Sequence, residues 1–171
     1  MKIGIQTWGS HGDIRPFLAL AKGLQKVNHE VSLVITGPVD KEYISKISQD
    51  NITVTPIACD ILLGKVEALD HYQFIKQKNP ITQMKQILSE VFLPVEDQMH
   101  EASKALCANN DIVIGHYILY PLQIAAEKQK VPYINISLIH GLIPTANKLP
   151  MGMPNIGSWG NLFIWWITRK L

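Results

Sequence analysis

The sequence has little of several features that would assign a protein to a class directly. It contains two cysteines, Cys59 and Cys107, which lie far apart and lack the spacing of a metal site. No apolar run reaches the roughly 20 residues that a membrane-spanning helix needs, and no signal peptide is evident. We therefore expect reduced thiols, no metal, and a cytoplasmic protein that does not span a membrane.

Charge of either sign is also sparse and nearly balanced. The 16 lysines and arginines against 14 aspartates and glutamates give a formal net charge of +2, and no basic cluster stands out. A nucleic-acid partner is therefore not expected. Hydrophobic residues make up 47% of the 171 residues and charged residues 18%. This composition and length predict one folded domain with a single core.

Apolar runs alternate with helical patterns along the chain. Such alternation is typical of parallel strands joined by crossover helices, so we expect an α/β fold with a Rossmann-like parallel sheet and helices on both faces. The helical pattern of 81–106 is interrupted by Pro94, which predicts a kink or two helices. An apolar helix is expected over 158–171, with one face on the sheet. The expected strands are 3–7, 31–35, 52–57, 112–115 and 133–137.

A glycine turn follows the first expected strand and precedes an amphipathic helix over 17–27. Gly9 and Gly12 permit a tight turn, and Ser10 adds a hydroxyl beside the free amides of a helix N-terminus. These three residues suit a phosphate or another anion. Their spacing matches neither the dinucleotide fingerprint nor the P-loop.

Asp13, at the end of this turn, has two interpretations. As a helix N-cap its carboxylate would accept backbone N–H bonds, with Pro16 tolerated in the first turn because the amides there lack partners within the helix. Alternatively it projects into a cleft and takes the proton from a hydroxyl nucleophile. The spacing alone favours the cap.

The chain resembles the N-terminal domain of family-1 and family-28 type glycosyltransferases of the GT-B fold, the sterol glucosyltransferases and glycopeptide-antibiotic glycosyltransferases above all. The resemblance is weaker between Asp60 and Pro94. It is carried by residues 9–16, which read GSHGDIRP, and by 28–31, 111–116, 125–128 and 131–132.

In that family one Rossmann-like domain binds the acceptor and a second binds the nucleotide sugar. The resemblance covers the acceptor-binding domain over 1–171, and the donor-binding signature is absent from this sequence. It implies that Asp13 is the general base. His11 stands where many relatives have arginine and is the second candidate, with an exposed loop residue as its other interpretation. The turn of Gly9, Ser10 and Gly12 would lie near the donor phosphates.

Two further histidines follow the fourth and fifth expected strands. His116 and His140 would lie at the edge where a pocket should open, either as acceptor-pocket residues or as hydrogen-bonded structural histidines. The last helix is apolar almost all round, so it needs a cover: a second domain, a second copy in a homo-oligomer, or a membrane surface contacted peripherally.

The resemblance thus predicts half of a hexosyltransferase that transfers a sugar from a UDP- or dTDP-sugar to a hydroxyl of a lipid-like or small-molecule acceptor, without a further cofactor. The chain alone should be inactive, because half a cleft cannot hold both substrates. Its partner would be a C-terminal donor-binding domain or a separate subunit. A noncatalytic subunit of a split glycosyltransferase is the second interpretation, and a stand-alone flavodoxin-like ligand-binding domain is the third.

Overall fold

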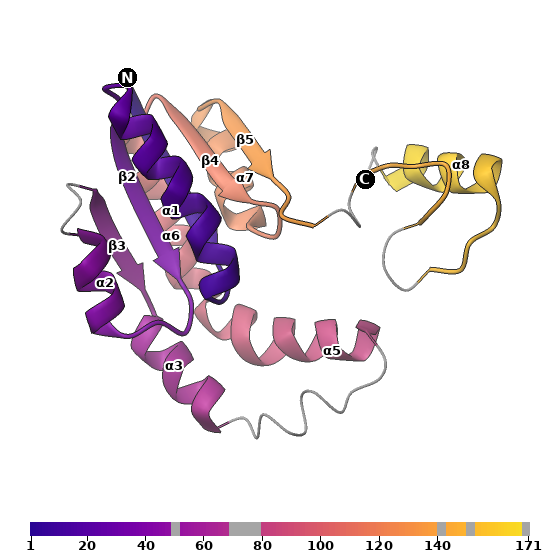
Figure 1. Ribbon diagram of the computed structural model, residues 1–171, viewed down its shortest axis with the longest axis horizontal. Helices are drawn as coiled ribbons and strands as arrows, with labels where there is room; N and C mark the ends of the chain where they lie inside the picture. The colour runs from indigo at the N-terminus through magenta and orange to yellow at the C-terminus, as the bar shows by residue number, and fades with distance from the viewer. Residues whose placement is uncertain (49–51, 69–79, 140–142, 150–152, 169–171) are drawn as a thin grey trace.

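The computed structural model describes residues 1–48, 52–68, 80–139, 143–149 and 153–168. Five strands form one sheet in the order β3-β2-β1-β4-β5, and all four strand pairs are parallel (Figure 1). The strands are β1 (Lys2–Trp8), β2 (Glu30–Thr36), β3 (Thr53–Ile57), β4 (Ile112–His116) and β5 (Tyr133–Ile136). They coincide closely with the five expected runs, which confirms the α/β prediction.

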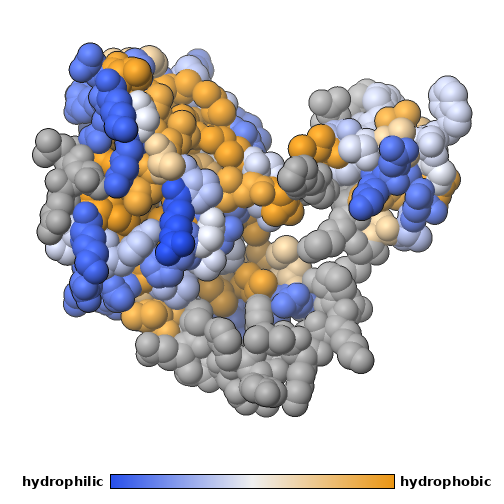
Figure 2. All heavy atoms as spheres, viewed as in Figure 1, coloured by the Kyte–Doolittle hydropathy of each residue, from blue (hydrophilic) through white to orange (hydrophobic). Residues whose placement is uncertain are grey.

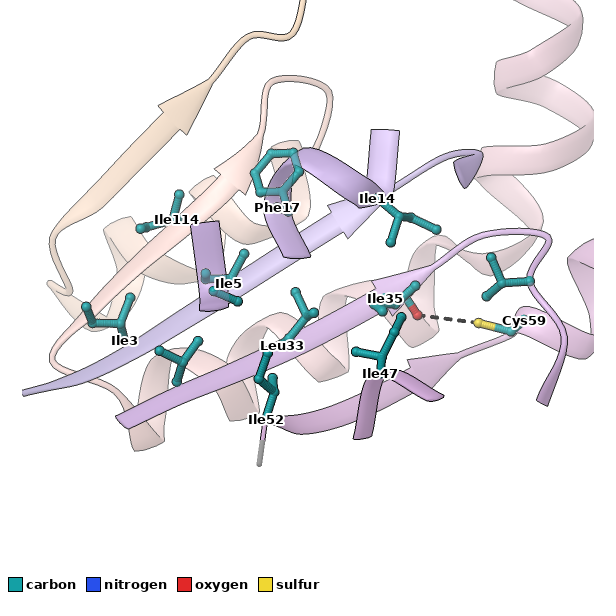
Figure 3. Close-up of a cluster of buried hydrophobic side chains, with 13 residues drawn as sticks. Ile3, Ile5, Ile14, Phe17, Leu33, Ile35, Ile47, Ile52, Cys59 and Ile114 are labelled. Atoms are coloured by element: carbon teal, nitrogen blue, oxygen red, sulfur yellow. Dashed lines mark hydrogen bonds between the residues drawn. The ribbon is translucent and has the colours of Figure 1, made fainter. Parts of the chain in front are cut away.

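One face of the sheet is covered by α1 (His11–Lys26) and α2 (Lys41–Ser48). Ile14 and Phe17 of α1 point from above into the isoleucines and leucine of the strands (Figure 3). Each such fully buried side chain contributes about 1.5–3 kcal/mol of hydrophobic free energy. The strand residues of this layer are Ile3, Ile5, Val31, Leu33, Ile35 and Ile114.

The other face packs against α6 (Glu96–Asn109) and α7 (Tyr120–Gln129), with α3 (Cys59–Ala68) beside them. Gly4 lets α6 approach β1 closely, since a Cβ there would lie 2.7 Å from Leu106 Cγ. Gln6 is fully buried on the same face and is satisfied by α6. Its Nε2 donates to the Met99 carbonyl at 3.3 Å, and its Oε1 accepts from the Ser103 hydroxyl at 2.8 Å.

The long helical pattern before β4 is broken as the sequence predicted. α5 (Pro80–Ile87) passes into a π-helical turn, Leu88–Phe92, and a 3₁₀ turn, Leu93–Val95, before α6 begins. Pro94 lacks the N–H that a continuous helix requires. The break places Phe92 in the core, with its ring centroid 5.2 Å from Trp8 and 5.5 Å from Tyr120.

The last helix, α8 (Ser158–Thr168), lies to the side of the sheet (Figures 1 and 2), so the expectation that it packs on the sheet is wrong. Asn161 is fully buried and its Nδ2 donates to the Ala146 carbonyl at 2.9 Å. The Trp165 indole N–H donates to the Lys148 carbonyl at 2.8 Å. These donors find open carbonyls on the irregular segment before α8, which a paired strand does not offer.

The opposite face of α8 is apolar and exposed, with Trp159 90% accessible and Phe163 and Trp166 more than half accessible. Of the helices in the described ranges, none combines the length and hydropathy needed to cross a bilayer. Cys59 and Cys107 are buried free thiols, as expected.

Candidate active site

The candidate site lies where β1, β2 and β4 end. β1 is the middle strand, with β2 on one side and β4 on the other, so the residues that follow these three strands share one edge of the sheet. Gly9 follows β1, Gly37 follows β2, and His116 is the last residue of β4. Ligands of open α/β sheets bind beyond this carboxyl edge.

The glycine turn starts α1 earlier than the sequence suggested. Ser10 is extended, with φ −78° and ψ 178°, and is the N-cap, so Asp13 is the third residue of the helix. The prediction of Asp13 as N-cap is therefore wrong, and Pro16 lies in the second turn. Asp13 still serves the helix end, because its Oδ2 accepts from the Ser10 backbone N–H at 2.9 Å and from the Ser10 hydroxyl at 3.2 Å.

The other carboxylate oxygen of Asp13 faces His116. Asp13 Oδ1 lies 3.8 Å from His116 Nε2, and the Asp13 side chain remains 39% exposed while that of His116 is 4% exposed. Neither ring nitrogen of His116 has a hydrogen-bond partner among the described residues. Burial lowers the pKa of His116 below 6.5, and the nearby Asp13 charge partly opposes this. At neutral pH the pair is thus a carboxylate beside a neutral imidazole.

Two aromatic rings hold the His116 ring in place. The Phe17 centroid is 5.8 Å away, and that of Tyr117 is 4.5 Å away. Burial, and secondarily the Asp13 charge, raises the pKa of the Tyr117 hydroxyl, so this group stays neutral as well. The arrangement leaves the Asp13 carboxylate as the charged group of the cluster.

His11 contacts Tyr43 and is not part of the cluster around His116. Its ring packs edge-to-face on Tyr43 of α2, with centroids 4.4 Å apart and planes at 77°. His11 and Asp13 therefore face different elements, although the sequence placed both in one turn. His140 lies outside the described residues.

Ser10 and Gly12 are exposed at the mouth of the turn, whereas Gly9 is buried beneath it. The Ser10 amide and hydroxyl already donate to Asp13, so a phosphate arriving at the turn would compete with that carboxylate. Phosphate binding at Gly9, Ser10 and Gly12 stays a prediction.

The pairing of Asp13 with His116 was missed by sequence reasoning, which proposed each residue separately. The signal that could have found it is topological. In a sheet whose chain crosses over after the third strand, the fourth strand pairs with the first, and their carboxyl ends then adjoin. A cavity of about 680 Å³ lies elsewhere, between β2, β3 and α6, and no predicted site residue lines it.

Comparisons with known proteins agree with this fold. The model of the glycosyltransferase family 28 N-terminal domain matches residues 3–138. A sterol 3-beta-glucosyltransferase of Kluyveromyces lactis is 53% identical over 36 residues, which are 21% of this chain and 3% of that protein.

Solved glycosyltransferases share the architecture at low identity. The glycosyltransferase SsfS6 of Streptomyces sp. SF2575 is 14% identical with a TM-score of 0.54, over 100% of this chain and 47% of that one. The calicheamicin glycosyltransferase CalG4 is 14% identical with a TM-score of 0.54, over 79% and 32%. The chain thus spans less than half the length of these relatives. It belongs to the glycosyltransferase family 28 N-terminal domain family and has the fold of one half of a GT-B glycosyltransferase.

Proposed function

We propose that this chain is the acceptor-binding half of an enzyme that transfers a hexose from a nucleotide sugar to a hydroxyl of a lipid-like or small-molecule acceptor. The observation that carries the proposal is the half-exposed Asp13 carboxylate at the carboxyl edge of β1, within 3.8 Å of His116. The family match supplies the reaction type, and the short sterol glucosyltransferase match favours an apolar acceptor.

Asp13 would act as general base. An acceptor hydroxyl must lose its proton as its oxygen attacks the anomeric carbon, whose bond to the nucleotide phosphate breaks while positive charge develops on the sugar. Asp13 Oδ2 is occupied by the two Ser10 donors, whereas Oδ1 accepts no hydrogen bond from the part of the chain that the structure describes and lies toward His116. Oδ1 is therefore the atom that would accept the proton.

His116 would assist this step without carrying charge in the resting state. Burial lowers the pKa of His116, so its ring is neutral at neutral pH and carries no extra proton beside the Asp13 carboxylate. When Asp13 takes up the hydroxyl proton, Nε2 lies near enough to share it after a small movement. His11 is the second candidate base, and its ring packs on Tyr43 of α2 rather than beside Asp13.

The donor would be a UDP- or dTDP-sugar held mainly by a second domain, which would belong to the same polypeptide or to a separate subunit. The turn of Gly9, Ser10 and Gly12 would contact its phosphates when the domains close. We expect no transfer by this chain alone, because positioning both substrates supplies much of the rate. The exposed apolar face of α8, with Trp159 at 90% accessibility, favours a docking role and keeps the split-enzyme arrangement as the second candidate.

The test is a transfer assay of the complete protein, with this domain and its donor-binding domain or subunit, against a panel of UDP- and dTDP-sugars and sterol and aglycone acceptors. Asp13→Asn should lower kcat about 100-fold or more, the usual contribution of a general base, while His11→Ala should keep most of it. If His11→Ala abolishes transfer and Asp13→Asn retains it, the base is His11.

The same assay distinguishes the second candidate. The donor-binding half would be supplied without this chain, with this chain, and with its Asp13→Asn variant. A noncatalytic subunit would restore activity equally well in both forms, whereas a catalytic half would restore it only with Asp13 intact.

A further inference from the structure

Gly37, the residue after β2, is the point on which the glycine turn rests. A Cβ at this position would lie well inside 3.0 Å of the Gly9 carbonyl oxygen, closer than real Cβ atoms come, and 3.4 Å from Ile14 Cδ1. Gly37 does not have a positive φ, unlike Gly9 and Gly157 among the described glycines. Gly37 is therefore required for space rather than for its backbone conformation.

A hydrogen bond holds the two glycine segments together. The Gly9 N–H donates to the Thr36 carbonyl at 3.0 Å, so the turn after β1 is pressed onto the end of β2. Gly9 itself has φ +126°, and a Cβ on it would collide with the Asp13 carboxylate. A continuous line of contacts thus runs from Gly37 through Gly9 to Asp13, and from Asp13 Oδ1 to His116.

We propose that Gly37 is a positioning residue for Asp13: its missing side chain lets the Gly9 turn seat against β2, and this seating holds the Asp13 carboxylate beside His116. The inference rests on the proposed role of Asp13 as the base and adds the element that sets its place. The Gly9 carbonyl is backbone and cannot swing aside as a flexible side chain does. A methyl group at residue 37 must therefore shift the whole turn, on the order of 1 Å, which is enough to cost about 100-fold in rate where alignment matters.

The experiment follows the His116 ring by NMR through a pH titration of this chain. Asp13 and Tyr117 are the titratable groups placed against that ring. Asp13→Asn removes the charge that raises the pKa of His116, so the midpoint should fall. Gly37→Ala should lower the midpoint in the same direction, because the carboxylate moves away. Gly23→Ala is the matched control. Gly23 lies in α1, and apart from its chain neighbours and the backbone of its own helix no atom of the described residues lies within 4 Å of the added methyl. The His116 midpoint of this variant should equal that of the unaltered chain.

Each outcome decides the inference. A folded Gly37→Ala chain with the unaltered His116 midpoint would overturn it. Should Gly37→Ala fail to fold alone, it is repeated in a background with Gly23→Ala and Lys130→Gly, both chosen to stabilise helices. Failure to fold there also counts against the inference, which holds that the turn shifts while the sheet stays intact.

The complete enzyme adds a second readout. Gly37→Ala should lower kcat about 100-fold with KM for the acceptor changed far less, and Gly23→Ala should change neither. A lowered His116 midpoint with unchanged kcat would leave Gly37 as the residue that places Asp13 and would refute Asp13 as the base. The two proposals therefore fail in distinguishable ways.

Discussion

Asp13 has two jobs in this account, and two substitutions separate them. It satisfies the first turn of α1 by accepting from the Ser10 N–H at 2.9 Å, and its Oδ1 lies 3.8 Å from His116 Nε2, where it would meet the acceptor hydroxyl. Asp13→Ala removes the hydrogen bonds, at about 1 kcal/mol, and the charge at the helix N-terminus, at about 0.3–1 kcal/mol. Asp13→Asn keeps an acceptor oxygen for Ser10 and loses only the charge.

With Asp13 39% exposed, the charge contribution belongs at the low end of its range. We expect Asp13→Ala to lower the free energy of unfolding by about 1.3 kcal/mol and Asp13→Asn by about 0.3 kcal/mol. In a domain of this size each kcal/mol moves the thermal midpoint by about 2–4 °C, so the two variants are resolvable by thermal melting and by urea titration.

Activity should not follow stability. In the complete enzyme both variants should lose about 100-fold or more in kcat, since neither side chain can act as a base. Asp40→Asn is the control, because Asp40 directly precedes α2 and its Oδ1 accepts from the Tyr43 N–H at 2.7 Å, so this carboxylate also satisfies a backbone donor at the start of a helix. It should cost similar stability and no activity. Equal stability losses for Asp13→Asn and Asp13→Ala, with transfer retained in Asp13→Asn, would refute the reasoning.

Three further outcomes are expected. Burial lowers the pKa of His116 below 6.5 in the folded state, so the contribution of neutral His116 to stability is complete above pH 6.5 and is lost as the pH falls toward the folded-state pKa. Over this pH range the urea midpoint of His116→Gln should therefore fall less than that of the unaltered chain. Lys130→Gly should raise the thermal midpoint by about 2–4 °C, since Lys130 ends α7 with φ 57° in the left-handed region. Phe92→Ala should cost about 3–5 kcal/mol in chemical denaturation, because Phe92 is fully buried between Trp8 and Tyr120. An unchanged midpoint in either of the last two variants would contradict the packing described.

The sheet could be predicted because its information is local. Runs such as Ile3 to Thr7 are buried on both faces, and near-continuous apolar residues are the mark of strands in parallel sheets. Pro94 likewise predicted the break before α6, since a proline inside a helix removes one of its backbone hydrogen bonds.

The start of α1 and the place of α8 could not be predicted, because they depend on more than periodicity. Ser10 rather than Asp13 caps α1, because the position of the turn depends on Gly9, which has φ +126° and lies against the end of β2. α8 buries Asn161 and Trp165 against carbonyls of the irregular segment that precedes it rather than against the sheet. Apolar residues all round α8 predict that it is covered and say nothing of what covers it.

The residues of the candidate site were predicted one by one from the sequence, and the strand order of the sheet brings two of them together. Asp13 and His116 were each proposed from their positions after strands, whereas their proximity requires that β4 pair with β1. His11, the immediate neighbour of the turn, contacts Tyr43 instead. Adjacency in sequence was therefore a poorer guide than strand pairing to which side chains lie close together.

The most direct measurement is a crystal structure of the complete protein with a nonhydrolysable nucleotide sugar and an acceptor bound. The account predicts that the reacting acceptor hydroxyl lies within about 2.6–3.2 Å of Asp13 Oδ1, on the side facing the anomeric carbon. A reacting hydroxyl held by His11 or by another group, with Asp13 bonded to Ser10 alone, would contradict it.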